Sequence, residues 1–150
     1  MIKSRPVYQL NYYIWISSLY HNLYYMNVPE NLKYTAEHEW IRVEGEEIVV
    51  GVTDFAQGEL GDVVFIEIET EGETLALGDT FGTIEAVKTV SDLYMPVDGE
   101  IVEVNPALED SPELVNSEPF EGGWMIRVKL SDPSQLDDLI PAEQYSAMIG

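Results

Sequence analysis

Residues 82–101 read GTIEAVKTVSDLYMPVDGEI and place two β-rich runs on either side of a lysine. No glycine, proline or Asn-Gly pair lies between the runs. A hairpin must therefore reverse through residues 86–89, most simply by a type I turn, which accepts ordinary residues. This reversal places Lys88 at an exposed tip. The stretch predicts a β-hairpin that displays one lysine, with the carboxylates of Glu85 and Asp92 on its two arms.

Other short β-rich runs follow residue 39. Residues 40–43 and 48–52 flank a glycine turn, which is typical of two adjacent strands. Residues 63–69 alternate with a period of two, which indicates a half-buried strand. The face expected to be buried carries Val64, Ile66 and Ile68.

The second half of the chain contains further strand signals. The Asp98-Gly99 pair predicts a short hairpin between residues 93–97 and 100–104. Pro96 has no amide hydrogen, so the first arm is expected at a sheet edge or a bulge. A final strand is expected at residues 124–130. Its apolar face, expected to be buried, carries Trp124, Ile126, Val128 and Leu130. Its solvent-exposed face carries Met125, Arg127 and Lys129.

Helical periodicity marks the tail of the chain and one internal segment. Residues 131–140 and 141–149 place apolar side chains at helical spacings, and residues 54–60 predict one or two helical turns. Short strands separated by turn signals, with few helices, are typical of a small sandwich or barrel with its helices packed outside. The sequence therefore predicts a mainly β fold of short antiparallel strands.

The charge of the chain excludes several classes of function. Its 150 residues include 28 acidic and 7 basic side chains, for a net charge of −21, and no cysteine. So negative a surface repels phosphate backbones, which argues against nucleic-acid binding. The absence of cysteine removes disulfides, thiolate zinc sites and a cysteine nucleophile. Hydrophobic residues make up 45% of the chain, enough for the core of one ordinary domain.

The first 25 residues differ in composition from the rest. They contain Lys3 and Arg5 but no acidic residue, so all 28 acids lie from Met26 onward. Polar residues interrupt the apolar stretch, which argues against both a secretory signal and a membrane span. A mitochondrial leader should be rich in Arg and Ser rather than Tyr. We expect residues 1–25 to be a non-native or disordered extension and residues 26–150 to form the domain.

Catalytic signatures are scarce. His38 is the only histidine after Met26, so neither a Cys–His pair nor a multi-histidine metal site can form there. The chain has no glycine-rich phosphate loop. Carboxylates are abundant, but in so acidic a chain most of them are solvated surface. These observations argue against an enzyme in its own right.

The stretch around Lys88 closely resembles the lipoyl-attachment motif of the glycine cleavage system H-protein family. Glu85, Val87 and Thr89 are the neighbours of the lysine in this motif. The resemblance covers the chain from about Met26 to the C-terminus, in order and without large gaps. Three further blocks resemble the family: residues 27–34 with 38–40, residues 51–57 with 60–65, and residues 110–117 with 123–124.

Two related families are less similar to this chain. Biotin carriers share the fold, but their lysine is usually flanked by methionines rather than by Val87 and Thr89. Lipoyl domains of the 2-oxoacid dehydrogenases are similar only around the tip, since they lack the His38-Glu39-Trp40 opening and the long helical tail. The resemblance implies a lipoyl-type barrel-sandwich hybrid, with a short internal helix and C-terminal helices.

The resemblance also implies a function as a carrier rather than an enzyme. Lipoic acid would be attached to Lys88 as an amide, by a lipoate ligase or a lipoyl/octanoyl transferase. The carrier would take the aminomethyl group of glycine from the pyridoxal-phosphate-dependent decarboxylase (P protein) to the tetrahydrofolate-dependent aminomethyltransferase (T protein). Dihydrolipoamide dehydrogenase (L protein) would then reoxidise it. The implied location is the bacterial-type cytoplasm, with the mitochondrial matrix less favoured, and no membrane is involved.

Family knowledge places the loaded arm in a surface cleft, and Glu39 and Asp92 match positions associated with that cleft. A carboxylate is a suitable neighbour for a protonated amine. Glu37 stands where some relatives have a small hydroxyl residue, so this cleft would be more negative.

Two alternatives stay open: a lipoate carrier of the same fold that serves lipoyl relay or sulfur metabolism, and an unmodified acidic binding module.

Overall fold

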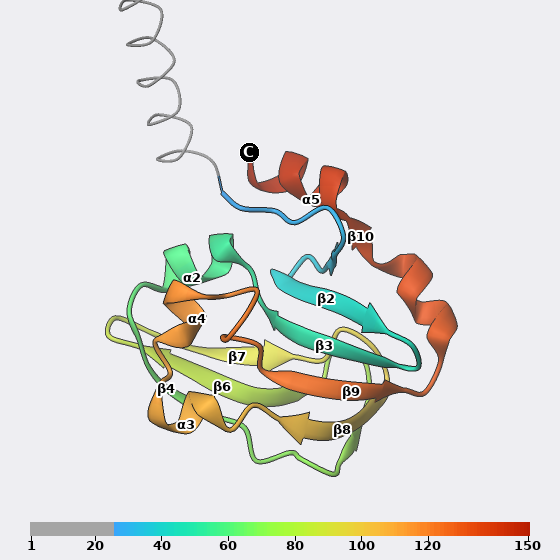
Figure 1. The fold of residues 1–150 in the computed structure, drawn as a ribbon, viewed down its shortest axis with the longest axis horizontal. Helices are drawn as coiled ribbons and strands as arrows, with labels where there is room; N and C mark the ends of the chain where they lie inside the picture. The colour runs from blue at the N-terminus through green and yellow to red at the C-terminus, as the bar shows by residue number, and fades with distance from the viewer. Residues whose placement is uncertain (1–25) are drawn as a thin grey trace, which may run out of the picture.

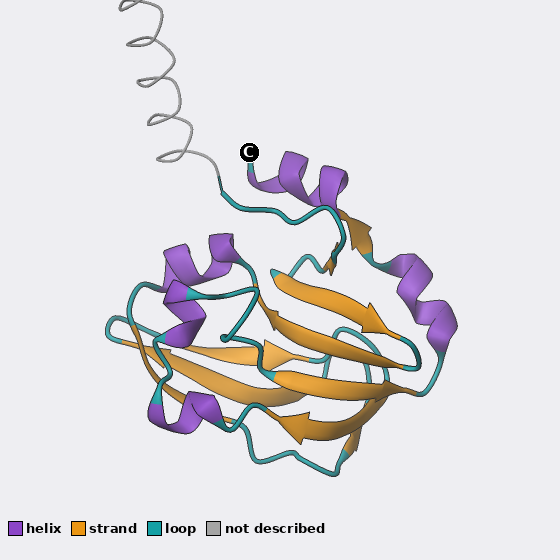
Figure 2. Ribbon diagram, in the orientation of Figure 1, coloured by secondary structure: helices purple, strands orange, loops and turns teal. Residues whose placement is uncertain are grey.

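The computed structural model describes residues 26–150, which form two antiparallel sheets with the helices at their margins (Figure 1, Figure 2). The expectation for residues 1–25 lies outside the described residues. The larger sheet has the strand order β10 (Ile140–Pro141), β1 (Lys33–Tyr34), β2 (Glu39–Glu44), β3 (Glu47–Val52), β9 (Ile126–Leu130), β8 (Gly99–Val104) and β5 (Thr74–Leu75). The smaller sheet has the order β4 (Val63–Glu67), β6 (Thr80–Ala86) and β7 (Val90–Tyr94).

Short helices complete the fold. They are α2 (Asp54–Leu60), α3 (Ala107–Asp110), α4 (Leu114–Ser117), the 3₁₀ helix η1 (Pro133–Asp138) and α5 (Ala142–Ile149). Thr53 caps α2 with its side chain, which accepts a hydrogen bond from the Ala56 amide. The predicted mainly β fold, with an internal helix and C-terminal helices, is confirmed. The two sheets of the described chain do not close into one barrel.

The hydrophobic core lies between the two sheets. Ile41 and Val50 of the larger sheet and Ile84 and Leu93 of the smaller sheet are buried in the same cluster. Burial of such side chains is the main favourable contribution to folding. The core therefore fixes the smaller sheet, and with it the β6–β7 hairpin, against the larger one.

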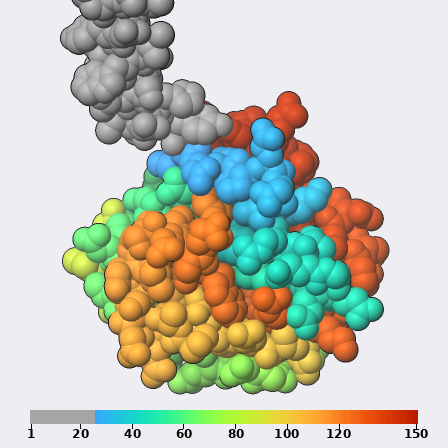
Figure 3. All heavy atoms as spheres, in the orientation of Figure 1, coloured from blue at the N-terminus to red at the C-terminus, as the bar shows by residue number. Residues whose placement is uncertain are grey.

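A second cluster covers the other face of the larger sheet at its β1 end. Tyr34, Trp40 and Tyr145 are fully buried there, and Tyr34 stacks on Tyr145 with the ring centroids 4.5 Å apart. β1 pairs with β10, so the beginning of the described chain and its C-terminal segment lie side by side (Figure 3). Gly51 lies opposite Trp40, and a Cβ at Gly51 would come within 2.6 Å of the indole nitrogen.

The predicted Asp98-Gly99 hairpin is wrong. β7 pairs with β6 in the smaller sheet, whereas β8 pairs with β5 and β9 in the larger one. Residues 95–98 carry the chain from one sheet to the other, and Pro96 lies in this connection rather than in an edge strand. Backbone hydrogen bonds from Gly78 to Met95 and from Met95 to Asp79 hold the crossover in place. The pairing is therefore decided by long-range contacts rather than by the local turn signal.

The predicted burial pattern is also wrong at two strands. In β4 the register shifts between Val63 and Phe65, so Val64 is an extra, exposed residue instead of sharing the buried face of Ile66. At the end of the chain, the strand begins at Ile126 rather than at residue 124. Met125 is fully buried, because it lies ahead of the strand and its amide donates to the carbonyl of Val50. Residues 131–140, expected as helical, form η1 followed by the start of β10.

Candidate functional site

The β6–β7 hairpin reverses at the predicted place. Glu85 pairs with Val90, and the amide of Ala86 donates to the carbonyl of Thr89 at 2.8 Å. Lys88 lies at the tip between these residues and is exposed to solvent. The position of the turn at residues 86–89 is therefore confirmed, and the type of the turn stays a prediction.

The tip is held from outside the hairpin. The amide of Val87 donates to the carbonyl of Asp62, which lies just ahead of β4, at 3.0 Å. Gly61 has a φ of 80°, and the position of a Cβ there would be 3.3 Å from Lys88 Cε and 3.7 Å from its Nζ. The lysine side chain thus runs along Gly61 at the end of α2. A larger residue at Gly61 would be strained and would crowd the lysine.

Asn116 of α4 fixes the segment that holds the tip. Its Oδ1 accepts from the amide of Val63 at 2.9 Å, and its Nδ2 donates to the carbonyl of Gly61 at 2.9 Å and to Gln57 Oε1 at 3.0 Å. Asp62, whose carbonyl receives the Val87 amide, lies between the two bonded residues. Asn116 is therefore connected to the lysine turn through one short piece of backbone.

Two predicted carboxylates lie near the tip. Glu85 and Thr83 are alternate residues of β6 and point to the same face, and Asp92 of β7 pairs with Thr83. Glu85 and Asp92 are both exposed, so both arms of the hairpin carry an acid on its outer face. The neighbours Val87 and Thr89 are exposed as well.

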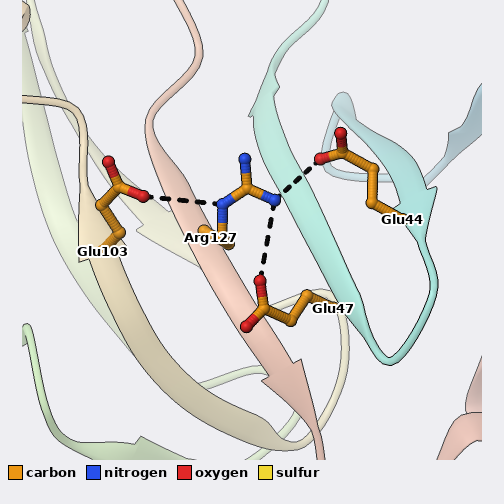
Figure 4. Close-up of polar contacts among 4 residues, drawn as sticks. All are labelled: Glu44, Glu47, Glu103 and Arg127. Atoms are coloured by element: carbon orange, nitrogen blue, oxygen red, sulfur yellow. Dashed lines mark hydrogen bonds and ion pairs between the residues drawn. The ribbon is translucent and has the colours of Figure 1, made fainter.

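Within residues 26–150 every ion pair involves Arg127, and Lys88 forms none. Arg127 lies on β9, where its guanidinium is 2.8 Å from Glu44, 3.7 Å from Glu47 and 3.6 Å from Glu103 (Figure 4). Partly exposed pairs of this kind contribute little stability individually. The lysine at the tip is left available for chemistry, because no carboxylate of the described chain pairs with it.

Glu39 is at a different place in the fold. It begins β2 of the larger sheet, pairs with Val52, and is 4% exposed. Its Oε1 accepts a hydrogen bond from the Thr35 hydroxyl at 2.9 Å. Burial raises the pKa of its carboxyl from an ordinary 4.5 to about 7, with the Thr35 hydrogen bond opposing this rise and the charge of Glu37 adding to it. Glu39 is therefore a buried carboxyl that titrates near neutral pH.

A polar cluster that the sequence did not predict lies near Glu39. The hydroxyl of Tyr145 is 2.8 Å from both His38 Nδ1 and Thr53 Oγ1. Burial raises the pKa of Tyr145, and the negative charge of Glu39 adds to the rise. His38 also adopts a positive φ of 68°. These contacts give His38 a structural role in joining the C-terminal helix to the sheet.

Helix α2 connects β3, the strand that pairs with Glu39, to the glycine beside Lys88. It begins at Asp54, two residues after Val52, the partner of Glu39, and ends at Leu60, next to Gly61, which lies beside Lys88. A seven-residue helix is about 10 Å long, at 1.5 Å per residue. Glu39 lies in the larger sheet and is buried, whereas Asp92 lies in the smaller sheet and is exposed.

No helix in residues 26–150 is both long enough and apolar enough to cross a bilayer. The same residues contain no group of three or more His, Asp or Glu side chains that could hold a metal ion.

The fold and the tip define a class of protein: a small barrel-sandwich domain that displays one lysine on a β-hairpin. Residues 32–150 match the model of the glycine cleavage H-protein family. A glycine cleavage system H protein of Bacteroides fragilis is 59% identical over 124 residues, which cover 83% of this chain and 98% of that protein. One from Staphylococcus haemolyticus is 58% identical over 125 residues, with 83% and 99% covered.

A solved structure agrees with the sequence relatives. The crystal structure of a glycine cleavage system H protein from Mycobacterium marinum matches with a TM-score of 0.74 and 37% identity, over 81% of this chain and 98% of that one. The chain belongs to the glycine cleavage H-protein family, and this membership supports a role as a lipoyl carrier in glycine cleavage.

Replacing Asn116 by Ala should loosen the lysine turn. The change leaves the Val63 amide and the Gly61 carbonyl without their partner, which should lower the free energy of unfolding by about 2 kcal/mol. Hydrogen exchange at the Val87 amide, followed by NMR, should accelerate more than exchange in β2 and β3. Ser117→Ala, at the exposed neighbouring position, should change neither quantity. Unaltered exchange at Val87 in Asn116→Ala would contradict this account.

Glu39→Gln should remove a pH dependence of stability. The folded chain keeps Glu39 protonated up to about pH 7, whereas the unfolded chain ionises it above about 4.5. The wild type should therefore lose stability as pH rises through this window, by up to roughly 3 kcal/mol. In urea unfolding at several pH values, the free energy of unfolding of Glu39→Gln relative to the wild type should rise by this amount as the pH increases from 4.5 to 7.

The matched control is Glu46→Gln, in the exposed turn between β2 and β3. The difference in unfolding free energy between this variant and the wild type should be flat from pH 4.5 to 7. An equally flat difference for Glu39→Gln would show that the buried carboxyl does not titrate in this range.

Proposed function

We propose that this chain carries lipoic acid as an amide on Lys88 and acts as the mobile carrier between the enzymes of glycine cleavage. The observation that supports this most is the exposed lysine, free of ion pairs with described residues, at the hairpin tip of a chain in this family. Attachment requires the Nζ ammonium to lose one proton, so that the free amine can attack an activated lipoyl donor, and a second proton leaves the nitrogen as the amide forms. The new N–C bond then replaces the bond to the leaving group.

The residues around the tip fit such a group. Glu85, Val87 and Thr89 surround Lys88 and are exposed, so a modifying enzyme can approach the amine. When bound, the lipoyl group supplies a disulfide that is reduced as it accepts the aminomethyl group of glycine. The protein itself supplies a rigid platform and a tethered arm, which raises the effective concentration of the reactive sulfur at each partner. We infer that it performs no catalysis of its own.

Glu39 is the residue we propose to receive the protonated amine of the loaded arm. Helix α2 leads from Lys88 to the strand that pairs with Glu39, over about 10 Å. An incoming ammonium would favour ionisation of the buried carboxyl, since a nearby positive charge stabilises the charged form. Asp92 lies on the outer face of the hairpin, where it would contribute to the cleft only near the tip.

The proposed partners are the decarboxylase, the aminomethyltransferase and dihydrolipoamide dehydrogenase, together with a lipoate ligase or a lipoyl/octanoyl transferase. A carrier with net charge −21 would be attracted to basic surfaces around the active-site entrances of these enzymes. We propose a cytoplasmic location of the bacterial type. The domain would comprise residues 26–150, with residues 1–25 as an extension.

Lipoylation of the whole chain tests the proposal. The chain should gain one lipoyl group in lipoate-supplied cells or with ligase, lipoate and ATP, and intact mass should detect it. Lys88→Arg should gain none, while Lys129→Arg, the control, should be modified like the wild type. An unmodified wild type would overturn the assignment and favour an unmodified acidic binding module. A group that survives Lys88→Arg would overturn the assignment to Lys88.

Glycine–bicarbonate exchange with the partner decarboxylase completes the test. The lipoylated chain should support exchange, and the unmodified chain should not. A chain that is lipoylated at Lys88 but supports no exchange would instead favour a lipoate carrier for lipoyl relay or sulfur metabolism.

A further inference from the structure

Exposed apolar side chains gather around the tip. Residues 26–150 contain eight exposed large hydrophobic residues, and half of them lie in β4 or on the β6–β7 hairpin. These four are Val64 (49% exposed), Phe65 (48%), Val87 (77%) and Val90 (63%), and we call them the tip patch. Such a concentration beside one candidate site marks an interaction surface more often than scattered exposed residues do.

The patch exists because β4 departs from regular alternation. A regular strand would turn one of two consecutive residues toward the core. The bulge between Val63 and Phe65 exposes both Val64 and Phe65 instead. Bulges commonly redirect side chains next to functional sites, and a local departure from the expected pattern often accompanies function. The smaller sheet thus loses regular pairing at the place where it displays these two residues.

The pairing of the three strands shows that the patch is continuous with the lysine turn. Phe65, Glu85 and Val90 form one row across β4, β6 and β7, and residues directly opposite each other share a face. Phe65 and Val90 therefore flank Glu85 on the outer face. Val87 is joined to β4 through its bond to Asp62, two residues before Val64. The side chain of Lys88 lies against Gly61 and does not cover the tip patch.

Acidic residues surround these apolar side chains. The next row across the sheet is Glu67, Thr83 and Asp92, and Glu67 and Asp92 are exposed, as is Asp62 beside the turn. A complementary surface would offer an apolar pocket bordered by Lys or Arg side chains. This describes the chemistry of the partner without identifying which partner it is.

The short reach of the unmodified lysine side chain favours the modifying enzyme as the partner. Before acylation the reacting amine is only one side chain away from the turn, so the modifying enzyme must bring its site against the residues beside Lys88. After acylation the long arm can enter a partner's site with the tip held further away. We propose that the tip patch is the docking surface for the enzyme that acylates Lys88. This inference rests on the proposed function and adds β4 to the site.

Exchanging valine for threonine tests the patch without changing side-chain shape. Threonine is similar in size to valine and suits a strand, so Val64→Thr/Val90→Thr should fold normally. With the unmodified full chain as substrate for ligase, lipoate and ATP, the double variant should raise KM about fivefold at unchanged kcat. Val43→Thr, at a 45% exposed position of β2, is the matched control and should leave KM unchanged.

Further measurements separate the possible results. An unaltered KM for the double variant would overturn the inference, even though Lys88 is still modified. If the double variant fails to fold, Val90→Thr alone, at the more exposed position, should still raise KM. After complete lipoylation with excess ligase, the double variant should support the wild-type rate of glycine–bicarbonate exchange. A loss confined to that exchange would assign the patch to the decarboxylase, and concentration-dependent dimers lost in the variant would assign it to a second copy of the chain.

Discussion

The hydrogen bond from the Val87 amide to the Asp62 carbonyl holds the lysine turn against the backbone just ahead of β4. A two-stranded hairpin is marginally stable by itself, and its tip is the part least restrained by pairing. Here β4 lies beside the hairpin, and the backbone just ahead of β4 holds the turn. One such bond contributes only about 1 kcal/mol. It acts on a segment that Asn116 already fixes at Gly61 and Val63, so the turn shares the rigidity of the domain.

Much of the fold can be predicted because its signals are local. Helix α2, the β2–β3 hairpin and the reversal at residues 86–89 each depend on a few neighbouring residues, and all three are present. The Asp98-Gly99 signal fails because β7 and β8 belong to different sheets, which depends on long-range packing. The predicted burial of Val64 fails because a bulge has no distinctive sequence here. The predicted exposure of Met125 fails because the strand begins at Ile126 rather than at residue 124.

The residues of the candidate site also fall into those that local sequence predicts and those that only the fold reveals. The lysine, its neighbours and the acids on the hairpin could be found from sequence, since they are consecutive or nearly so. Asn116 could not, because its partners are more than fifty residues away along the chain, although it lies in a segment that resembles the family. The burial of Glu39 also could not be predicted from the sequence, since an acid ahead of a strand is exposed in most proteins. Its raised pKa follows from the fold alone.

The placement of the lysines explains how one of them can be selected for modification. Residues 26–150 contain three lysines. Lys33 lies in β1, which is paired on both sides, and Lys129 lies in β9, between β3 and β8. Both of these lysines lie within paired strands, whereas Lys88 lies at an exposed turn that an enzyme can approach more easily. Selection therefore needs little sequence recognition, and the neighbouring residues are free to adjust how tightly the modifying enzyme binds.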